Sequence, residues 1–317
     1  MWDEYNLLKV YESIIKRAAI LNEPFMLKGS LLTRQYYPKK NRCINDIDWV
    51  YMKKIDDKDE AGSIFSKWMT KITEMDLDDD VIFRSFKEND FWRMIDYAMD
   101  DDFPTVNTDI AYKIKGKDNI DEVGLDISFN LDLDFEPVPI LYETLEGEKI
   151  SFPYTVPLSV QAAWKLHQTV VRARFKDLVD LKYIFSHKDF TSDLLQEMFQ
   201  TLVNELYADK IYNNERLKSL LSGNFDYIFN EQLCVLEWGD YNFNAYVECN
   251  DEIEALNNPG KYTTYGKSKY ARWYKKQCFD TFASELWKVM NSVGIDENSY
   301  NLLPKPTKKS LYPELED

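Results

Sequence analysis

Two short groups of residues near the start of the chain have types and spacing suited to phosphate chemistry. Gly29 and Ser30 follow an apolar run, and after 15 intervening residues come Asp46 and Asp48. A glycine turn followed by a helix lets backbone amides approach phosphate groups, and a serine hydroxyl can add a hydrogen bond. Residues i and i+2 of a strand point to one side, so both aspartates would offer the hard oxygen ligands that Mg²⁺ prefers. The pattern predicts a site for a nucleotide and a metal ion.

A third carboxylate would complete such a site, and Asp126 is the candidate. It interrupts an apolar alternation over residues 125–129. We expect Asp126 to help hold a second ion and to accept the proton of an attacking hydroxyl. The alternative is an aspartate that faces solvent at the edge of a sheet. The Asp-x-Asp pairs at 76–78 and 132–134 have the same form but no glycine turn at the matching distance.

The elements that must position these residues follow from the spacing of apolar side chains. Helical spacing predicts an opening helix, a short second helix and a third one, at 4–21, 31–37 and 61–73. Alternation predicts strands at 25–27, 46–52, 108–114 and 123–129. From residue 157 onward long helical periods take over, at 158–173, 177–186, 191–207 and 266–291. We therefore expect an α+β protein with a mixed sheet and flanking helices in a domain over 1–155, followed by a mainly helical domain over 156–317.

Composition limits the possible classes of protein. The 317 residues carry a formal net charge of −16 and are 44% hydrophobic, which argues against disorder and against a basic nucleic-acid coat. The four cysteines are dispersed, which favours reduced thiols and no zinc knuckle. No apolar stretch is long enough for a signal peptide or a membrane span, so we expect a cytoplasmic protein with no membrane partner. Acidic runs such as 78–80 are expected to be solvated loops.

One segment, residues 151–187, is basic in this acidic background, with five lysines and arginines against two aspartates. On a helix Lys165, Gln168 and Arg172 share one face and could present cations to phosphate oxygens. The alternative is a solvated basic helix. The neighbours that could extend the cationic face, or form ion pairs within it, are Arg174, Lys176, Asp177 and Asp180.

Together these residues resemble the nucleotidyltransferases of the DNA polymerase β-like superfamily, and within it the AbiEii-like toxins. Lys28-Gly29-Ser30 is similar to a Lys-Gly-Gly opening, with serine at the second glycine. The block from Trp164-Lys165-Leu166 to Asp180-Leu181 is similar to a helical Lys…Arg…Lys/Arg-Asp…Asp-Leu signature. The resemblance covers residues 25–186. It implies nucleotide binding by Lys28, Gly29, Ser30, Arg34, Arg42, Lys165, Arg172, Arg174, Lys176 and Asp177.

The resemblance also implies a reaction. Two Mg²⁺ ions on Asp46, Asp48 and Asp126, with Lys165 as a further catalytic residue, would support transfer of a nucleoside monophosphate from a nucleoside triphosphate to a hydroxyl of tRNA or protein. The setting would be toxin–antitoxin or phage defence, with a cognate antitoxin as partner. The alternatives are a small-molecule acceptor of the antibiotic type and an inactive fold that only binds. Residues 261–276 mix six cations with five aromatics, a pattern typical of either RNA binding or the start of an ordinary helix.

Overall fold

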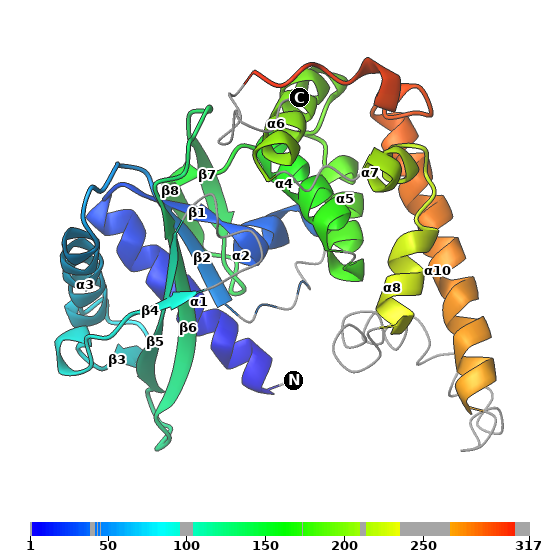
Figure 1. The fold of residues 1–317 in the computed structure, drawn as a ribbon. Helices are drawn as coiled ribbons and strands as arrows, with labels where there is room; N and C mark the ends of the chain where they lie inside the picture. Colours follow the sequence, from blue (N-terminus) through cyan, green and yellow to red (C-terminus); the bar gives the residue numbers. More distant parts are fainter. Residues whose placement is uncertain are drawn as a thin grey trace. The chain divides into compact units, whose positions relative to one another are not determined.

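The computed structural model of the protein describes residues 2–38, 42, 44, 46–95, 104–172, 174–209, 214–234 and 267–307. It divides the chain into two compact units, Met1–Pro157 and Leu158–Asp317. The first holds a mixed sheet with helices, and the second is helical (Figure 1). The predicted α+β class is therefore confirmed. None of the helices in the described ranges is long and apolar enough to cross a membrane.

An eight-stranded sheet organises the first unit. Its strands are β1 (Phe25–Lys28), β2 (Asp46–Tyr51), β3 (Val81–Phe83), β4 (Arg93–Ile95), β5 (Thr105–Ile114), β6 (Asp121–Phe129), β7 (Val138–Glu143) and β8 (Lys149–Thr155). The spatial order is β3-β5-β6-β2-β1-β8-β7, with β4 also paired to β5. The pairs β2/β6 and β1/β8 are parallel and the others are antiparallel. All four predicted strands are present, and β2 and β6 lie side by side in the middle of the sheet.

One face of this sheet is apolar and packs against α3 (Lys58–Glu74), which lies beside the sheet in Figure 1. Phe25 stacks on Trp68 of α3 with ring centroids 3.8 Å apart, and Trp49 meets the same ring edge-on at 5.2 Å. Aromatic pairs of this kind add stability beyond the area that they bury. Because side chains alternate along a strand, Asp46 and Asp48 must lie on the opposite face from Trp49.

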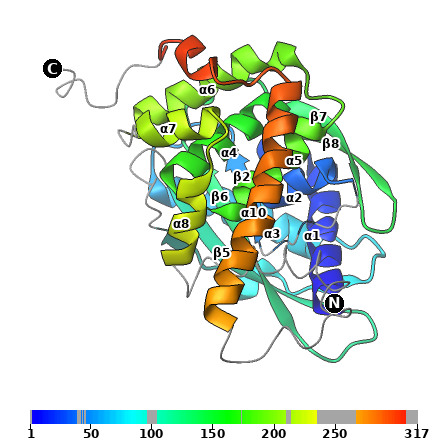
Figure 2. The ribbon, with the colours of Figure 1, turned by 90° about the vertical axis from the view of Figure 1, so that its right-hand side faces the viewer.

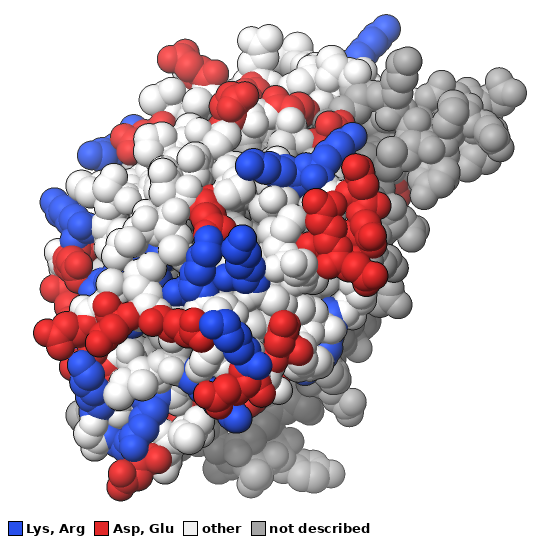
Figure 3. Space-filling model, turned by 90° about the vertical axis from the view of Figure 1, so that its left-hand side faces the viewer, with Lys and Arg blue, Asp and Glu red and all other residues white. Residues whose placement is uncertain are grey.

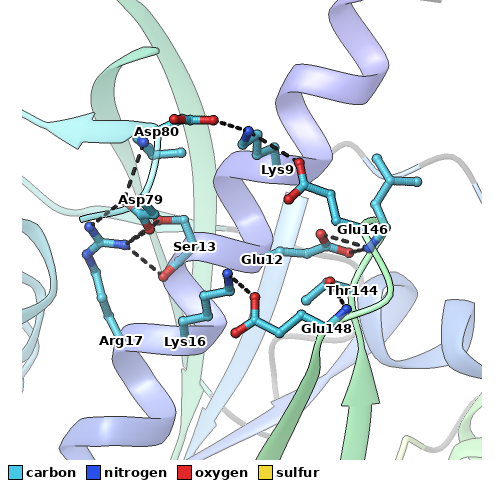
Figure 4. Close-up of polar contacts among 12 residues, drawn as sticks. Lys9, Glu12, Ser13, Lys16, Arg17, Asp79, Asp80, Thr144, Glu146 and Glu148 are labelled. Atoms are coloured by element: carbon cyan, nitrogen blue, oxygen red, sulfur yellow. Dashed lines mark hydrogen bonds and ion pairs between the residues drawn. The ribbon is translucent and has the colours of Figure 1, made fainter. Parts of the chain in front are cut away.

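The opening helix α1 (Trp2–Leu21) is tied to the sheet unit by buried and partly buried polar contacts (Figure 4). Arg17, 2% exposed, donates to Asp79 at 2.6 and 3.1 Å, and Lys9 pairs with Asp80 at 2.5 Å. Burial acts to raise the pKa of Asp79, but the hydrogen bonds from Arg17 and Ser13 outweigh it and hold the pKa below the usual range. The expectation that 78–80 is simply a solvated loop is therefore wrong for Asp79, because Arg17 needs a buried counter-charge.

Glu12 of α1 is also buried, and Figure 4 shows its carboxylate against the backbone of the loop after β7. It accepts hydrogen bonds from the amide of Leu145 at 2.9 and 3.0 Å and lies 3.5 Å from Nη1 of Arg34. Burial raises the pKa of Glu12 to about 7, more than the amide and the arginine lower it. The folded protein therefore holds the Glu12 proton more tightly than the unfolded chain does.

This difference predicts a pH effect on stability. The contribution of Glu12 to the free energy of unfolding is fully present below pH 4.5, the ordinary value for glutamate, and is lost as the pH rises through about 7. Glu12→Gln mimics the neutral acid and does not titrate. When the pH is raised from 4.5 to 8, the free energy of unfolding of the wild type should therefore fall relative to that of the variant by up to about 3 kcal/mol. Urea unfolding of both proteins at the two pH values measures it. A difference that does not change with pH would contradict the expectation.

The second unit consists of helices (Figure 2), and buried aromatic side chains pack between them. Phe175 lies 4.8 Å from Phe282, and Phe229 lies 5.1 Å from Phe279, between ring centroids, which joins the last helix to two earlier ones. The helices are α4 (Leu158–Val171), α5 (Phe175–Ser186), α6 (Leu195–Ala208), α7 (Asn214–Leu221), α8 (Asp226–Cys234) and α10 (Lys267–Ser292). The four helices predicted after residue 157 are confirmed as α4, α5, α6 and α10.

The net negative charge does not give a surface of a single sign. Figure 3 shows lysine and arginine side chains interspersed with aspartate and glutamate over the face that it presents. Exposed ion pairs of this kind occur in the first unit, as between Lys71 and Glu23 at 2.6 Å and between Lys87 and Glu74 at 2.9 Å. Each contributes little to stability because solvent screens it. The overall charge therefore predicts little about which ligands this face repels.

Candidate active site

The parallel pairing of β2 with β6 brings the predicted carboxylates together. Asp48 is the register partner of Asp126, and Asp46 is the partner of Gly124. Asp46, Asp48 and Asp126 therefore lie on the same face of two neighbouring central strands. Asp126 is only 6% exposed, so the alternative of a solvent-facing aspartate at a sheet edge is wrong.

The two paired aspartates are the centre of a polar row that crosses five strands. Asp48 is also the register partner of Lys28 on β1, Asp126 is the partner of Asn107 on β5, and Asn107 is the partner of Arg93 on β4. Directly paired residues share a face of the sheet, so the order Lys28, Asp48, Asp126, Asn107, Arg93 is a continuous line on the polar face. Two cations therefore lie at the ends of a line with two carboxylates at its centre.

The glycine turn closes against this row. Gly29 has φ +72°, and a Cβ atom built on it would lie 1.9 Å from Oδ2 of Asp48. Only glycine combines that backbone conformation with that close approach. Gly29 begins the short helix α2 (Gly29–Thr33), and Oγ of Ser30 is buried with no hydrogen-bond partner among the described residues. The glycine that approaches the Asp48 carboxylate is therefore followed directly by a serine whose hydroxyl has no hydrogen-bond partner among the described residues.

Gly29→Ala is expected to lower the free energy of unfolding by about 1–2 kcal/mol through its backbone alone, because L-residues avoid this φ. The clash with Asp48 adds to that cost and moves the carboxylate. Gly116→Ala is the matched control, since Gly116 has φ +81° and nothing within 4 Å of its Cβ position. Chemical denaturation should show a larger loss of stability for Gly29→Ala than for Gly116→Ala. Equal losses would show that the Asp48 contact has no effect.

Neighbouring side chains set the electrostatics of the carboxylates. Nδ2 of Asn107 donates to Oδ1 of Asp126 at 2.5 Å. Tyr11 of α1 is fully buried, and burial, together with the charges of Asp46, Asp48 and Asp126, raises its pKa. Tyr11 therefore stays neutral.

The residue types on this face suit a hard divalent cation, since all three candidate ligands are carboxylates. The side chains as they stand do not form a closed metal site. Within the described part of the chain no three histidine, cysteine, aspartate or glutamate side chains gather closely enough to hold an ion. One oxygen of Asp126 is instead engaged by Asn107. The donor chemistry of the three aspartates therefore fits Mg²⁺, and their side chains would have to move to bind an ion together.

The other predicted residues of the first unit have different surroundings. Nζ of Lys28 donates to Oγ of Ser128 at 2.9 Å, on the polar face of the sheet. Arg34, in the 3₁₀ turn Arg34–Tyr36, is 2% exposed and lies beside Glu12, so its charge pairs with a buried glutamate in the interior of the unit. Arg42 is half-buried, four residues before Asp46. Nucleotide binding by these three residues stays a prediction.

Two of the predicted cations of the second unit, Lys165 and Arg174, form an ion network with buried aspartates of α5. Nζ of Lys165 lies 3.0 Å from Oδ1 of Asp177 and 2.9 Å from Oδ2 of Asp180, and both aspartate side chains are 0% exposed. Arg174 donates to Asp177 at 2.7 Å and to Gln168 at 2.9 Å. Burial acts to raise the pKa of Asp177, but Lys165 and Arg174 outweigh it and lower the pKa. The ion pair between Asp177 and Arg174, one of the alternatives that the sequence left open, is therefore present.

This network changes the interpretation of the basic helix. Lys165 is not a solvated lysine, since its side chain is 12% exposed and contacts two carboxylates. Arg172, directly after α4, and Lys176, on α5, are half-buried. Phosphate binding by Lys165, Arg172, Arg174, Lys176 and Asp177 stays a prediction. Of the basic and aromatic segment, residues 261–266 lie outside the described residues, and 267–276 form the start of α10, where only the backbone is described.

Sequence reasoning missed Asn107 and Arg93. A signal existed for Asn107, because Asn107 and Asp109 fall on one side of β5 and the apolar Val106 and Ile110 on the other. For Arg93 no spacing in the sequence points to the site. Arg93 approaches it through the pairing of β4 with β5.

A family model described as "Nucleotidyl transferase AbiEii toxin, Type IV TA system" matches residues 14–228. No curated protein matches the chain. Among solved structures, MenT4, a nucleotidyltransferase toxin from Mycobacterium tuberculosis H37Rv, is similar at 13% identity over 65% of each chain, with a TM-score of 0.39. JHP933 from Helicobacter pylori is similar at 20% identity, over 65% of this chain and 80% of that one, with a TM-score of 0.38. A nucleotidyltransferase-like protein from Paracoccidioides brasiliensis has 15% identity, covers 67% and 93%, and has a TM-score of 0.37.

Proposed function

Because this chain belongs to the AbiEii family of nucleotidyl transferase toxins of type IV toxin–antitoxin systems, we propose that it transfers a nucleoside monophosphate from a nucleoside triphosphate to an acceptor hydroxyl. The carboxylate face of the first unit is the proposed site. The observation that supports it is the pairing of Asp48 with Asp126 in register, with Gly29 packed against Asp48.

We assign Asp46 and Asp48 to holding divalent cations, with Asp126 as a further ligand. A bound cation there would neutralise phosphate charge and polarise the α-phosphate. The hydroxyl oxygen of the acceptor forms a bond to the α-phosphorus, the bond to the β-phosphate bridging oxygen breaks, and pyrophosphate leaves. Asp126 takes the hydroxyl proton. Oγ of Ser30, which has no hydrogen-bond partner among the described residues, is suited to donate to a phosphate oxygen.

The acceptor is the finer part of the proposal. The reaction requires an acceptor hydroxyl, and both RNA and proteins offer one. We propose that the acceptor is the hydroxyl at an RNA 3′ end. The experiment below distinguishes it from two other acceptors, a protein hydroxyl and a cationic small molecule. A cognate antitoxin is proposed from the family alone.

Incubation of the purified protein with Mg²⁺, total RNA, cell-extract protein and each α-³²P-labelled nucleoside triphosphate tests the function. Label that becomes soluble after ribonuclease identifies RNA, label released by protease identifies protein, and label that passes a size filter as a new product identifies a small molecule. A parallel reaction with a chelator gives the background. Incorporation no higher than that background with all four nucleotides would overturn the proposed transfer and favour a fold that only binds.

A further inference from the structure

The polar row continues past the carboxylates to Asn107 and Arg93, which neither the motifs nor the proposed reaction uses. Asn107 donates to Oδ1 of Asp126 at 2.5 Å, and its Nδ2 also lies 3.4 Å from the carbonyl oxygen of Leu125. Nη2 of Arg93 donates to Oδ1 of Asn107 at 2.8 Å, and Arg93 also forms an ion pair with Asp109. The amide of Asn107 therefore bridges an arginine and the buried aspartate.

The direction of this chain follows from the donors and acceptors alone. A guanidinium has only donors, so the atom of Asn107 that faces Arg93 must be its oxygen. The amide nitrogen then faces Asp126, which, as a carboxylate, accepts. The orientation of the Asn107 amide is therefore set by Arg93, and Asp109 in turn pairs with the arginine. The ring of Phe91 lies 4.8 Å from the same guanidinium and further limits its position.

The hydrogen bond from Asn107 to Asp126 matters because Asp126 is buried. Asp126 is 6% exposed, and a buried carboxylate needs hydrogen bonds to stay charged and in one orientation. Asn107 is its cross-strand neighbour on the same face, so the contact is fixed by the register of β5 with β6. Residues that hold a metal ligand in this way commonly change metal affinity when they are replaced.

We propose that Asn107 is a positioning residue that fixes the carboxylate of Asp126 for cation binding, and that Arg93 acts through Asn107 by fixing the orientation of its amide. This inference rests on the proposed function, because it concerns a carboxylate assigned to that site. It extends the site to β4 and β5, beyond the motif residues of β1, β2 and β6.

Mn²⁺ binding to the full-length protein without nucleotide tests this, with free Mn²⁺ measured by electron paramagnetic resonance. Asn107→Leu keeps the approximate size of the side chain and removes the donor, and it should weaken Mn²⁺ binding by about 10- to 100-fold. Asn107→Gln keeps an amide and should recover part of that loss. Arg93→Leu leaves the donor in place but frees the amide to rotate, so we expect a smaller loss of about 3- to 10-fold. Arg84→Leu is the matched control, since Arg84 is an exposed arginine of the same unit paired with Glu88, and it should bind Mn²⁺ as the wild type does.

The outcomes separate this inference from the function on which it rests. Unchanged Mn²⁺ affinity in both Asn107→Leu and Arg93→Leu would overturn the positioning role and leave the proposed function intact. Tighter binding by Asn107→Leu would show that Asn107 competes with the ion for Asp126, which also overturns it. If Asn107→Leu does not fold, as judged by its melting curve, then Arg93→Leu against Arg84→Leu decides. A wild-type protein that binds no Mn²⁺ would overturn the metal assignment together with this inference.

Discussion

Asp48→Asn is expected to lower nucleotidyl transfer by about 10³-fold while leaving the fold intact. The amide has nearly the size of the carboxylate, so its packing against Gly29 and its place opposite Asp126 are kept. What is lost is the negative charge that would hold a cation against the triphosphate, and charge stabilisation of this kind is among the largest contributions to catalysis. Initial rates of label incorporation measure the effect.

Asp78→Asn is the matched control for this prediction. Asp78 belongs to an Asp-x-Asp pair of the same form but is fully exposed, at a positive φ of 52° that asparagine tolerates. We expect its activity and melting temperature to equal those of the wild type. Retention of more than a tenth of the activity in Asp48→Asn would exclude Asp48 as a metal ligand, and a loss in Asp78→Asn would show that general negative charge, not position, matters.

Lys165→Met should lower the stability of the second unit by about 3–5 kcal/mol. The substitution keeps a long side chain but leaves Asp180 and Asp177, both 0% exposed, without the charge that lies about 3 Å from each. Breaking a buried ion pair by removing one partner is costly because the remaining charge stays desolvated. Asp177 keeps Arg174 at 2.7 Å, so Asp180 should carry most of the cost.

Hydrogen–deuterium exchange of the full chain localises this effect. Peptides from α4 and α5 should exchange faster in Lys165→Met, while peptides from the central strands β2 and β6 should not change. Lys182→Met is the matched control, since Lys182 lies on α5, the helix that carries both aspartates, but pairs with the half-exposed Glu285, and its loss should cost about 1 kcal/mol or less. Unaltered exchange in α4 and α5 would show that the two aspartates are stabilised without Lys165, and would strengthen the case for Lys165 as a phosphate ligand.

Much of the secondary structure could be predicted from local patterns, and the misses have physical causes. Long periodic segments such as α1 and the alternating strands β5 and β6 carry enough apolar spacing to be recognised. The strands β7 and β8 were missed because each contains a proline, Pro139 and Pro153, which is typical of irregular segments. The strands β3 and β4 have three residues each, too few to show any alternation.

For the site, the sequence alone determined the residue types and which of them share a face. A period of two places Asp46 and Asp48 on one side of a strand in any sheet, and a glycine was required wherever a carboxylate approaches the backbone as closely as at Gly29. The tertiary structure decided which residues meet: Asp48 with Asp126, Asp126 with Asn107, and Lys165 with Asp177 and Asp180. Strand order, register and helix packing are set by long-range burial of apolar side chains, and a local pattern holds no information about which distant segment will be its neighbour.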